Sequence, residues 1–249
     1  MIIPGLMRPQ SSVRKSVVKT KTKTKLRPQL IVFDWDDTFT LGATDGYMAC
    51  YGAVAERLDL GLSQEEVRAR ILSQWGATQE IELQALIKGS DATLEDAVRI
   101  YEDNLFGNTF VKKLSFVDGA RDVLSALRGS TVMAVATGLN GDLLQDTIMP
   151  KFGVDRAMFS SISSVYDLED HTKAKPHPHM LERIMQTQSV SPQDTIMVGD
   201  SRGDMLMARA AGVEPVAVLT GHLTRQEAEE LNIEYILETV ADLPSILDV

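Results

Sequence analysis

Three aspartates stand close together in the N-terminal part of the sequence, directly after a short apolar run. The segment LIVFDWDDT places Asp34, Asp36 and Asp37 within four positions of one another. Carboxylates this close repel one another and lose hydration when they are buried, so the cluster is unfavourable unless a cation or a bound ligand compensates its charge. The cluster therefore indicates a site that binds a cation or a charged ligand.

Four short apolar runs predict the strands that would carry these acids and other polar residues. The runs are residues 30–33, 132–137, 195–200 and 215–219. They are continuous rather than alternating, as in strands that are buried on both faces of a parallel sheet. Helical patterns lie between them, over residues 141–152, 178–188 and 202–212. This order predicts the α/β fold class, with a doubly wound, Rossmann-like core around a parallel sheet.

The interval between the first two runs breaks this alternation. It carries helical patterns over residues 47–58, 63–75, 78–87 and 93–104. Because no strand-like run lies among them, we expect an inserted helical cap domain over residues 42–117, with the core formed by residues 29–41 and 118–249. Residues 1–28 contain eight basic residues and no acidic one. We expect a flexible basic tail there, because its like charges repel and little in it can be buried.

Polar residues are predicted to meet at one edge of this sheet. They are Asp34 and Asp36 after the first strand, Thr137 and Gly138 at the end of the second, and Asp200 at the end of the third. In open α/β sheets, ligands bind at the carboxyl ends of the parallel strands. The sequence therefore predicts a binding site at this edge.

Aspartates at a strand end can also cap helices, an interpretation that fits Asp37 well. Asp204, inside a predicted helix, could be a surface acid. For Asp34, Asp36 and Asp200 together, convergence on one edge makes capping the weaker account. Carboxylate oxygens are ligands that Mg²⁺ prefers, whereas zinc prefers histidine and cysteine. Only the HPH segment at residues 177–179 would favour a zinc site.

Four short motifs occur in a fixed order along the chain. They are DWDDT at 34–38, ATG at 136–138, KP at 175–176 and GDSRGD at 199–204. This set resembles the four-motif signature of the haloacid dehalogenase-like hydrolases, and the helical insertion lies where that family has its α-helical cap. The nucleotide-binding patterns GxxxxGK[ST] and GxGxxG do not occur in the sequence.

The resemblance implies roles for the acids. Asp34 would be a nucleophile that attacks phosphorus and forms an aspartyl-phosphate. Asp36 would protonate the leaving oxygen and later deprotonate the attacking water. Mg²⁺ would be held by Asp34, by the carbonyl of Asp36 and by the side chain of Asp200.

The resemblance also implies residues that bind the phosphoryl group. The hydroxyl of Thr137 would hold a phosphate oxygen, helped by backbone N–H groups near Gly138. Lys175 would balance the charge of the phosphoryl group and of the nucleophile. Asp204 and Thr38 would support the site, Asp204 by orienting water or Lys175.

These roles imply a Mg²⁺-dependent phosphatase acting on a small phosphorylated metabolite. The C-terminal part, from MVGDSRGDM to ADLP, resembles the phosphoglycolate phosphatase group, so phosphoglycolate or a similar phosphomonoester is expected as substrate. The segment FTLGATDG lacks the Leu-x-Asp-Ser continuation common in the family, which leaves the substrate open. The alternatives are a sugar phosphomutase resembling β-phosphoglucomutase and, more distantly, a non-catalytic binding or regulatory protein.

Composition limits the partners and the location. The net charge is −10 although the first 28 residues are basic, so the remainder is strongly acidic and poorly suited to bind nucleic acid. No window approaches the roughly 20 apolar residues that span a bilayer, so no membrane partner is expected. The single cysteine, Cys50, favours a reducing compartment. We expect a cytoplasmic location, while the composition of the tail also overlaps with that of organelle transit peptides.

Overall fold

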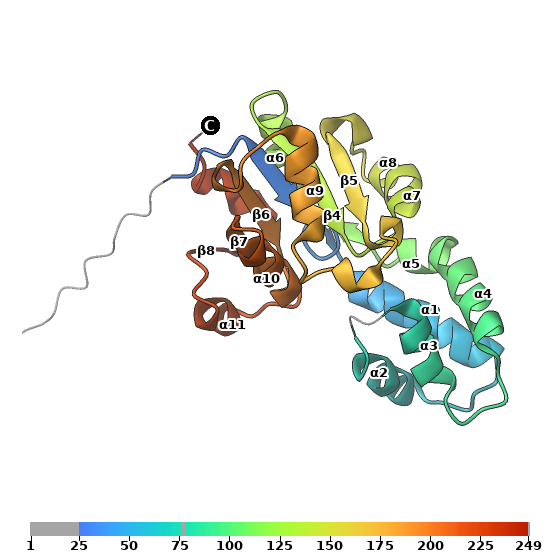
Figure 1. The fold of residues 1–249 in the computed structure, drawn as a ribbon. Helices are drawn as coiled ribbons and strands as arrows, with labels where there is room; N and C mark the ends of the chain where they lie inside the picture. Colours follow the sequence, from blue (N-terminus) through green and yellow to red (C-terminus); the bar gives the residue numbers. More distant parts are fainter. Residues whose placement is uncertain (1–24, 76–77, 249) are drawn as a thin grey trace, which may run out of the picture.

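A six-stranded parallel sheet forms the centre of the larger part of the protein (Figure 1). The computed structural model describes residues 25–75 and 78–248. In sheet order the strands are β5 (Ser161–Ser164), β4 (Val132–Thr137), β1 (Leu30–Phe33), β6 (Thr195–Gly199), β7 (Glu214–Val218) and β8 (Tyr235–Leu237). All neighbouring pairs are parallel. The predicted α/β, Rossmann-like core is therefore confirmed, with β1 between β4 and β6.

Helices cover both faces of this sheet. Successive side chains of a strand point to opposite faces. Leu30 and Val32 accordingly pack in one buried cluster with residues of α9 and α10, whereas Ile31 and Phe33 belong to a second cluster with residues of α6. The helices of the core are α6 (Ala120–Leu127), α7 (Gly141–Leu143), α8 (Met149–Lys151), α9 (His179–Gln188), α10 (Arg202–Ala210) and α11 (Arg225–Glu230). This arrangement is the doubly wound core that the sequence predicts.

Some local structure differs from the sequence-based expectation. The predicted helix over residues 141–152 contains a π-helical turn, Leu144–Ile148, between α7 and α8. Pro150 follows this turn and has no backbone N–H to donate within a regular helix. Strand β5 has the sequence SISS and contains a single apolar residue, so no apolar run indicated it.

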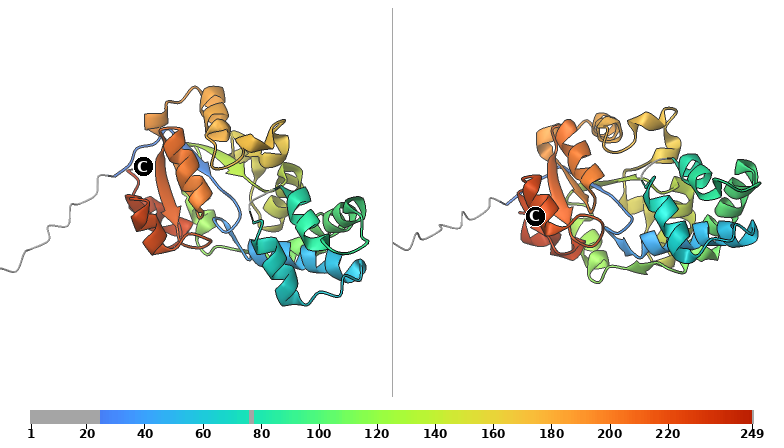
Figure 2. Two further views of the ribbon diagram at one scale, coloured as in Figure 1. Left: turned by 60° about the horizontal axis from the view of Figure 1, so that its bottom comes forward. Right: turned by 90° about the horizontal axis from the view of Figure 1, so that it is seen from below.

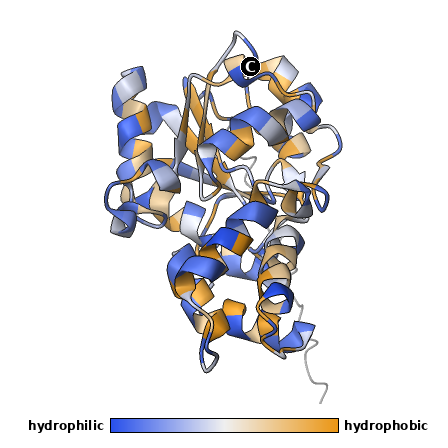
Figure 3. Cartoon of the chain, turned by 90° about the vertical axis from the view of Figure 1, so that its right-hand side faces the viewer, coloured by the Kyte–Doolittle hydropathy of each residue, from blue (hydrophilic) through white to orange (hydrophobic). Residues whose placement is uncertain are grey.

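A block of helices follows β1 and packs beside the core (Figures 1 and 2). It consists of α1 (Ala43–Arg57), α2 (Gln64–Leu72), α3 (Gln79–Ile87), α4 (Leu94–Leu105) and α5 (Asn108–Val111). We call these elements the helical insertion. Figure 3 shows apolar residues interspersed with polar ones along its helices, and buried apolar residues of α1 to α5 belong to one cluster with Phe33 and Trp35 of the core.

A short antiparallel pair joins the helical insertion to the core. Strand β2 (Thr40–Leu41), which enters the insertion, pairs with β3 (Ser115–Phe116), which leaves it. The sequence predicted the boundaries of the insertion close to these places, at residues 42 and 117, but not the pairing of the two connections. The pair brings the two connections side by side at the end of the sheet that carries Asp34.

The first described residues of the chain contact its C-terminal end. Of the predicted tail, residues 1–24 lie outside the described residues. Leu26 pairs with Leu247 near the C-terminus, and Arg27 forms an ion pair with Asp248. In the described part of the chain, none of the helices is both long enough and apolar enough to cross a membrane.

Candidate active site

Asp34 and Asp36 stand on a rigid turn at the carboxyl end of β1. The backbone N–H of Asp34 donates to the carbonyl oxygen of Val198 at 2.9 Å, so the chain is still held by the sheet at this point. It then turns around the buried Trp35, whose carbonyl oxygen accepts hydrogen bonds from the backbone N–H groups of residues 38–40. These bonds fix the backbone from which both carboxylates project.

Asp37 does not share this position. Its carboxylate accepts hydrogen bonds from the backbone N–H groups of Gly42 at 3.1 Å and Ala43 at 3.3 Å, at the start of α1. The capping interpretation of Asp37 is therefore confirmed.

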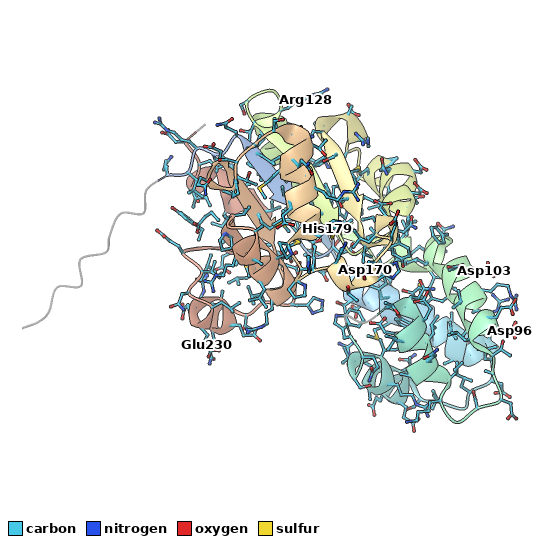
Figure 4. All side chains as sticks on the ribbon, in the orientation of Figure 1. Asp96, Asp103, Arg128, Asp170, His179 and Glu230 are labelled. Atoms are coloured by element: carbon cyan, nitrogen blue, oxygen red, sulfur yellow. The ribbon has the colours of Figure 1, made fainter. Side chains whose placement is uncertain are left out.

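Lys175 joins two of the acids. Its Nζ lies 2.6 Å from Oδ1 of Asp34 and 2.7 Å from Oδ1 of Asp204, and its side chain is only 15% exposed. The loop between β5 and α9 brings Lys175 to this place; Figure 4 labels Asp170 on the same loop, where it caps a short helical turn. Asp204 is fully buried, so it is not a surface acid.

Asp200 is held from two sides, immediately after β6. Its Oδ2 accepts a hydrogen bond from the backbone N–H of His222 at 3.0 Å, and the hydroxyl of Thr38 donates to its Oδ1 at 3.4 Å. The loop that carries His222 passes very close, because a Cβ atom added to Gly221 would lie 1.7 Å from Oδ2 of Asp200. Glycine at position 221 is therefore required for this approach.

The buried acids outnumber the single lysine between them, and this shows in their pKa values. Burial raises the pKa of Asp34 to about 6, with Lys175 opposing the shift. Burial and the neighbouring Asp34 raise the pKa of Asp36 to about 7, and burial also raises that of Asp200. Burial alone would lower the pKa of Lys175, but the two adjacent carboxylates outweigh it and raise the value. The site thus lacks positive charge.

A divalent cation bound between these acids would supply the missing positive charge. Asp34, Asp200 and Asp204 each offer a carboxylate oxygen, and these three atoms lie within 4.8 Å of one another. An all-oxygen donor set of this kind suits Mg²⁺. The group includes Asp204, for which the sequence analysis expected a supporting role, the orientation of water or of Lys175, and not direct binding of the metal. The carbonyl of Asp36 as a further ligand stays a prediction.

Thr137 and Gly138 reach the same end of the sheet on the neighbouring strand. Phe33, the last residue of β1, is paired with Val135 of β4, and β4 continues for two more residues to Thr137, which therefore lies beside the turn that follows β1. Thr137 is buried, and its hydroxyl accepts a hydrogen bond from the backbone N–H of Leu139 at 3.1 Å. Gly138 is exposed, and a Cβ atom added to it would meet nothing within 4 Å, so there is space beside this backbone.

The structure adds two residues that the sequence did not indicate. The phenol of Tyr47, on α1 of the helical insertion, donates a hydrogen bond to Oδ2 of Asp36 at 2.7 Å. His222 supports Asp200 through its backbone, and its ring contacts Trp75 of the insertion. Spacing along the chain could reveal neither residue, because the Tyr47 contact depends on how the insertion packs against the core, and His222 reaches Asp200 from a loop that follows it by 22 positions.

Known proteins share this arrangement. A family model described as haloacid dehalogenase-like hydrolase matches residues 28–212. A phosphoglycolate phosphatase of Pseudomonas putida is 29% identical over 206 residues, which cover 78% of this chain and 71% of that protein. Pyrophosphatase PpaX of Anoxybacillus flavithermus is 33% identical over 90 residues, and the match covers 36% of this chain and 42% of that protein.

The fold also has counterparts among solved structures. One from Haemophilus somnus, described as a predicted phosphoglycolate phosphatase, has a TM-score of 0.72 at 20% identity and covers 88% of this chain and 98% of its own. CbbY from Rhodobacter sphaeroides, solved in complex with phosphate, has a TM-score of 0.69 at 19% identity. The match covers 89% of this chain and 100% of the CbbY chain. The family model spans four of the six strands of the sheet (β1, β4, β5 and β6), the helical insertion and all four motifs, and the chain therefore belongs to the haloacid dehalogenase-like hydrolase family.

Proposed function

We propose that this enzyme is a Mg²⁺-dependent phosphatase that hydrolyses a phosphomonoester of a small metabolite, phosphoglycolate or a similar compound. One observation carries the proposal. Lys175 bridges Asp34 and Asp204 at the carboxyl edge of the sheet. Asp200 offers a further carboxylate oxygen there, and Asp36 follows Asp34 by two positions. A nucleophile, a proton-transferring group and a place for a cation are thus in one small, largely buried site, as phosphoryl transfer requires.

The reaction proceeds in two displacements. In the first, a carboxylate oxygen of Asp34 attacks phosphorus, the bond from phosphorus to the leaving oxygen breaks, and that oxygen takes a proton from Asp36. In the second, Asp36 takes a proton from water, the water oxygen attacks phosphorus, and the bond to Asp34 breaks. Asp34 and Asp36 are then restored, and the products are an alcohol and inorganic phosphate.

The remaining residues hold the charged groups in place. Mg²⁺ would be bound by Asp34, Asp200 and Asp204, with the carbonyl of Asp36 as a further ligand. When bound, it supplies positive charge that lowers the repulsion between a phosphate and the nucleophilic carboxylate. Lys175 would bind a phosphoryl oxygen while keeping Asp34 in its position.

A phosphoryl oxygen would also be bound on the β4 side of the site. The hydroxyl of Thr137 and the backbone N–H groups near Gly138 are the donors. The space beside Gly138 leaves room for such a group.

The helical insertion would act as a cap over this site, with residues 42–117 as the cap domain and residues 29–41 and 118–249 as the core. Contacts between the two parts support this role. Tyr47 reaches Asp36, and the hydroxyl of Tyr166 on the core donates to Gln79 of α3 at 3.2 Å. A cap in this position would exclude bulk water during transfer and would select the leaving group.

Phosphate release from a panel of phosphorylated metabolites tests the proposed function. Phosphoglycolate, sugar phosphates, glycerol phosphate and pyrophosphate are incubated with the enzyme, with Mg²⁺ or with a chelator. We expect turnover of at least one phosphomonoester with Mg²⁺ and none with the chelator. A folded protein that releases no phosphate from any of them would contradict the proposal. Turnover only with an added sugar bisphosphate, together with a long-lived phosphoenzyme, would instead identify a mutase.

Gly221→Ala is expected to weaken Mg²⁺ binding, because the added methyl group collides with Oδ2 of Asp200 at 1.7 Å and with its Cβ at 2.8 Å. We expect the Mg²⁺ concentration for half-maximal activity to rise about tenfold, as for other changes that displace a metal ligand. Gly203→Ala on α10 is the matched control, since its added Cβ would meet no atom closer than 3.5 Å. Equal Mg²⁺ dependence in both variants would contradict the close packing of this loop against Asp200.

A further inference from the structure

Tyr47 is the residue through which the helical insertion contacts Asp36. Its hydroxyl donates to Oδ2 of Asp36 at 2.7 Å. The ring of Tyr47 packs against Phe110, with 4.6 Å between ring centroids, and edge-on against Trp75 at 6.2 Å. Both neighbours belong to the insertion, so the insertion and not the core fixes the position of the phenol.

The other carboxylate oxygen of Asp36, Oδ1, has no such hydrogen-bond donor among the residues that the structure describes. It is also shielded from solvent. The backbone of Asp36 is fixed by the turn around Trp35. On a fixed backbone the carboxyl group of an aspartate is placed by rotation about its two side-chain torsions, and a hydrogen bond to one oxygen restricts both and so sets the direction of the other oxygen. Tyr47 therefore determines where Oδ1 points.

We propose that Tyr47 is a positioning residue for proton transfer: its hydrogen bond to Oδ2 directs Oδ1 of Asp36 toward the leaving oxygen of the substrate. This inference rests on the proposed function. A phenol suits the task because it donates to Oδ2 whether Oδ1 carries the proton or has lost it. Since the phenol is held by Phe110 and Trp75, the acid is correctly directed only when the insertion lies against the core.

The leaving group of the substrate separates this role from simple packing. An alkyl phosphate must receive a proton as its P–O bond breaks, whereas 2,4-dinitrophenolate leaves without one. Tyr47→Phe keeps the ring and its contacts but removes the donor. The rate of the first displacement is measured in single turnovers with both substrates, by release of the alcohol or phenol, so that the hydrolysis of the phosphoenzyme does not enter.

With Tyr47→Phe we expect the first displacement of the best alkyl phosphate to slow by about 10- to 100-fold, a part of the total contribution of general acid catalysis. With 2,4-dinitrophenyl phosphate we expect the rate of the first displacement to change by no more than about threefold. KM for either substrate should also change by no more than about threefold. Tyr51→Phe is the matched control. It lies one turn further along α1, and its hydroxyl donates to Glu82 within the insertion. It should not discriminate between the two substrates.

The Asp36→Asn background gives a second, independent readout. If Tyr47 acts through Asp36, Tyr47→Phe should add no further loss once the acid has been replaced, and the two effects will be non-additive. A loss that is equal for both substrates, or that persists in the Asp36→Asn background with unchanged melting temperature, would overturn the inference. So would full activity of Tyr47→Phe with the alkyl phosphate. If the wild-type enzyme itself released no phosphate, the proposed function would fail, and this inference with it.

Discussion

Asp34→Asn is expected to reduce phosphate release by about 10,000-fold or more, because the substitution removes the proposed nucleophile of the first displacement and leaves no group in its place. The amide keeps the size of the side chain and can still accept a hydrogen bond from Lys175, which lies 2.6 Å from Oδ1. Folding should therefore be little affected. Phosphate release under saturating Mg²⁺ measures the effect, and acid-quenched enzyme should carry a phosphoryl group in the wild type but not in the variant.

Asp37→Asn is the matched control for this experiment. Asp37 follows Asp34 by three positions but caps α1 through Gly42 and Ala43. Its backbone is left-handed, with φ of 52°, a conformation that asparagine tolerates. We expect its activity to stay within about threefold of the wild type, since an amide oxygen can accept the same hydrogen bonds. Comparable losses in both variants would contradict the assignment of Asp34 as the nucleophile.

Lys175→Met should lower kcat by about 100- to 1,000-fold, the range found when a donor that stabilises a developing charge is removed. The lysine is the cation between Asp34 and Asp204, so its loss also leaves two buried carboxylates against each other. We expect unfolding free energy without Mg²⁺ to fall by about 3 kcal/mol, as for other broken buried pairs. Urea unfolding and kcat, both measured at a temperature where the variant is folded, check the two effects.

Lys173→Met is the control for Lys175. It stands two residues earlier, in the helical turn His171–Lys173, and forms no ion pair with Asp34 or Asp204. Activity and stability should both remain close to the wild type. A large loss in Lys173→Met and a small one in Lys175→Met would show that the phosphoryl-binding lysine had been assigned wrongly.

Most of the core of the fold could be predicted from local sequence patterns. β1, β4, β6 and β7 could be predicted because strands buried on both faces need continuous apolar residues, and such runs are visible locally. β5 could not, because its SISS sequence has no such run and takes its conformation from the pairing with β4.

The sequence also placed several site residues at one edge of the sheet. Asp34, Asp36, Thr137 and Asp200 follow strands, and parallel strands end at the same edge, so their meeting could be expected from the strand pattern alone. The motif resemblance added Lys175 and Asp204, which no periodicity would have singled out.

Which atoms of these residues contact one another could not be predicted, because it depends on how distant parts of the chain pack together. Lys175 and Asp34 are separated by 141 positions, and the surface-acid interpretation of Asp204 was excluded only by its burial beside that lysine. The contact of Tyr47 with Asp36 depends on how the helical insertion packs against the core. Local periodicity shows which faces must be buried, but it carries no information on how two separately formed units dock. The residue types at the carboxyl edge of the sheet could therefore be predicted from the sequence, whereas the hydrogen bond between Tyr47 and Asp36 depends on the packing of the insertion against the core.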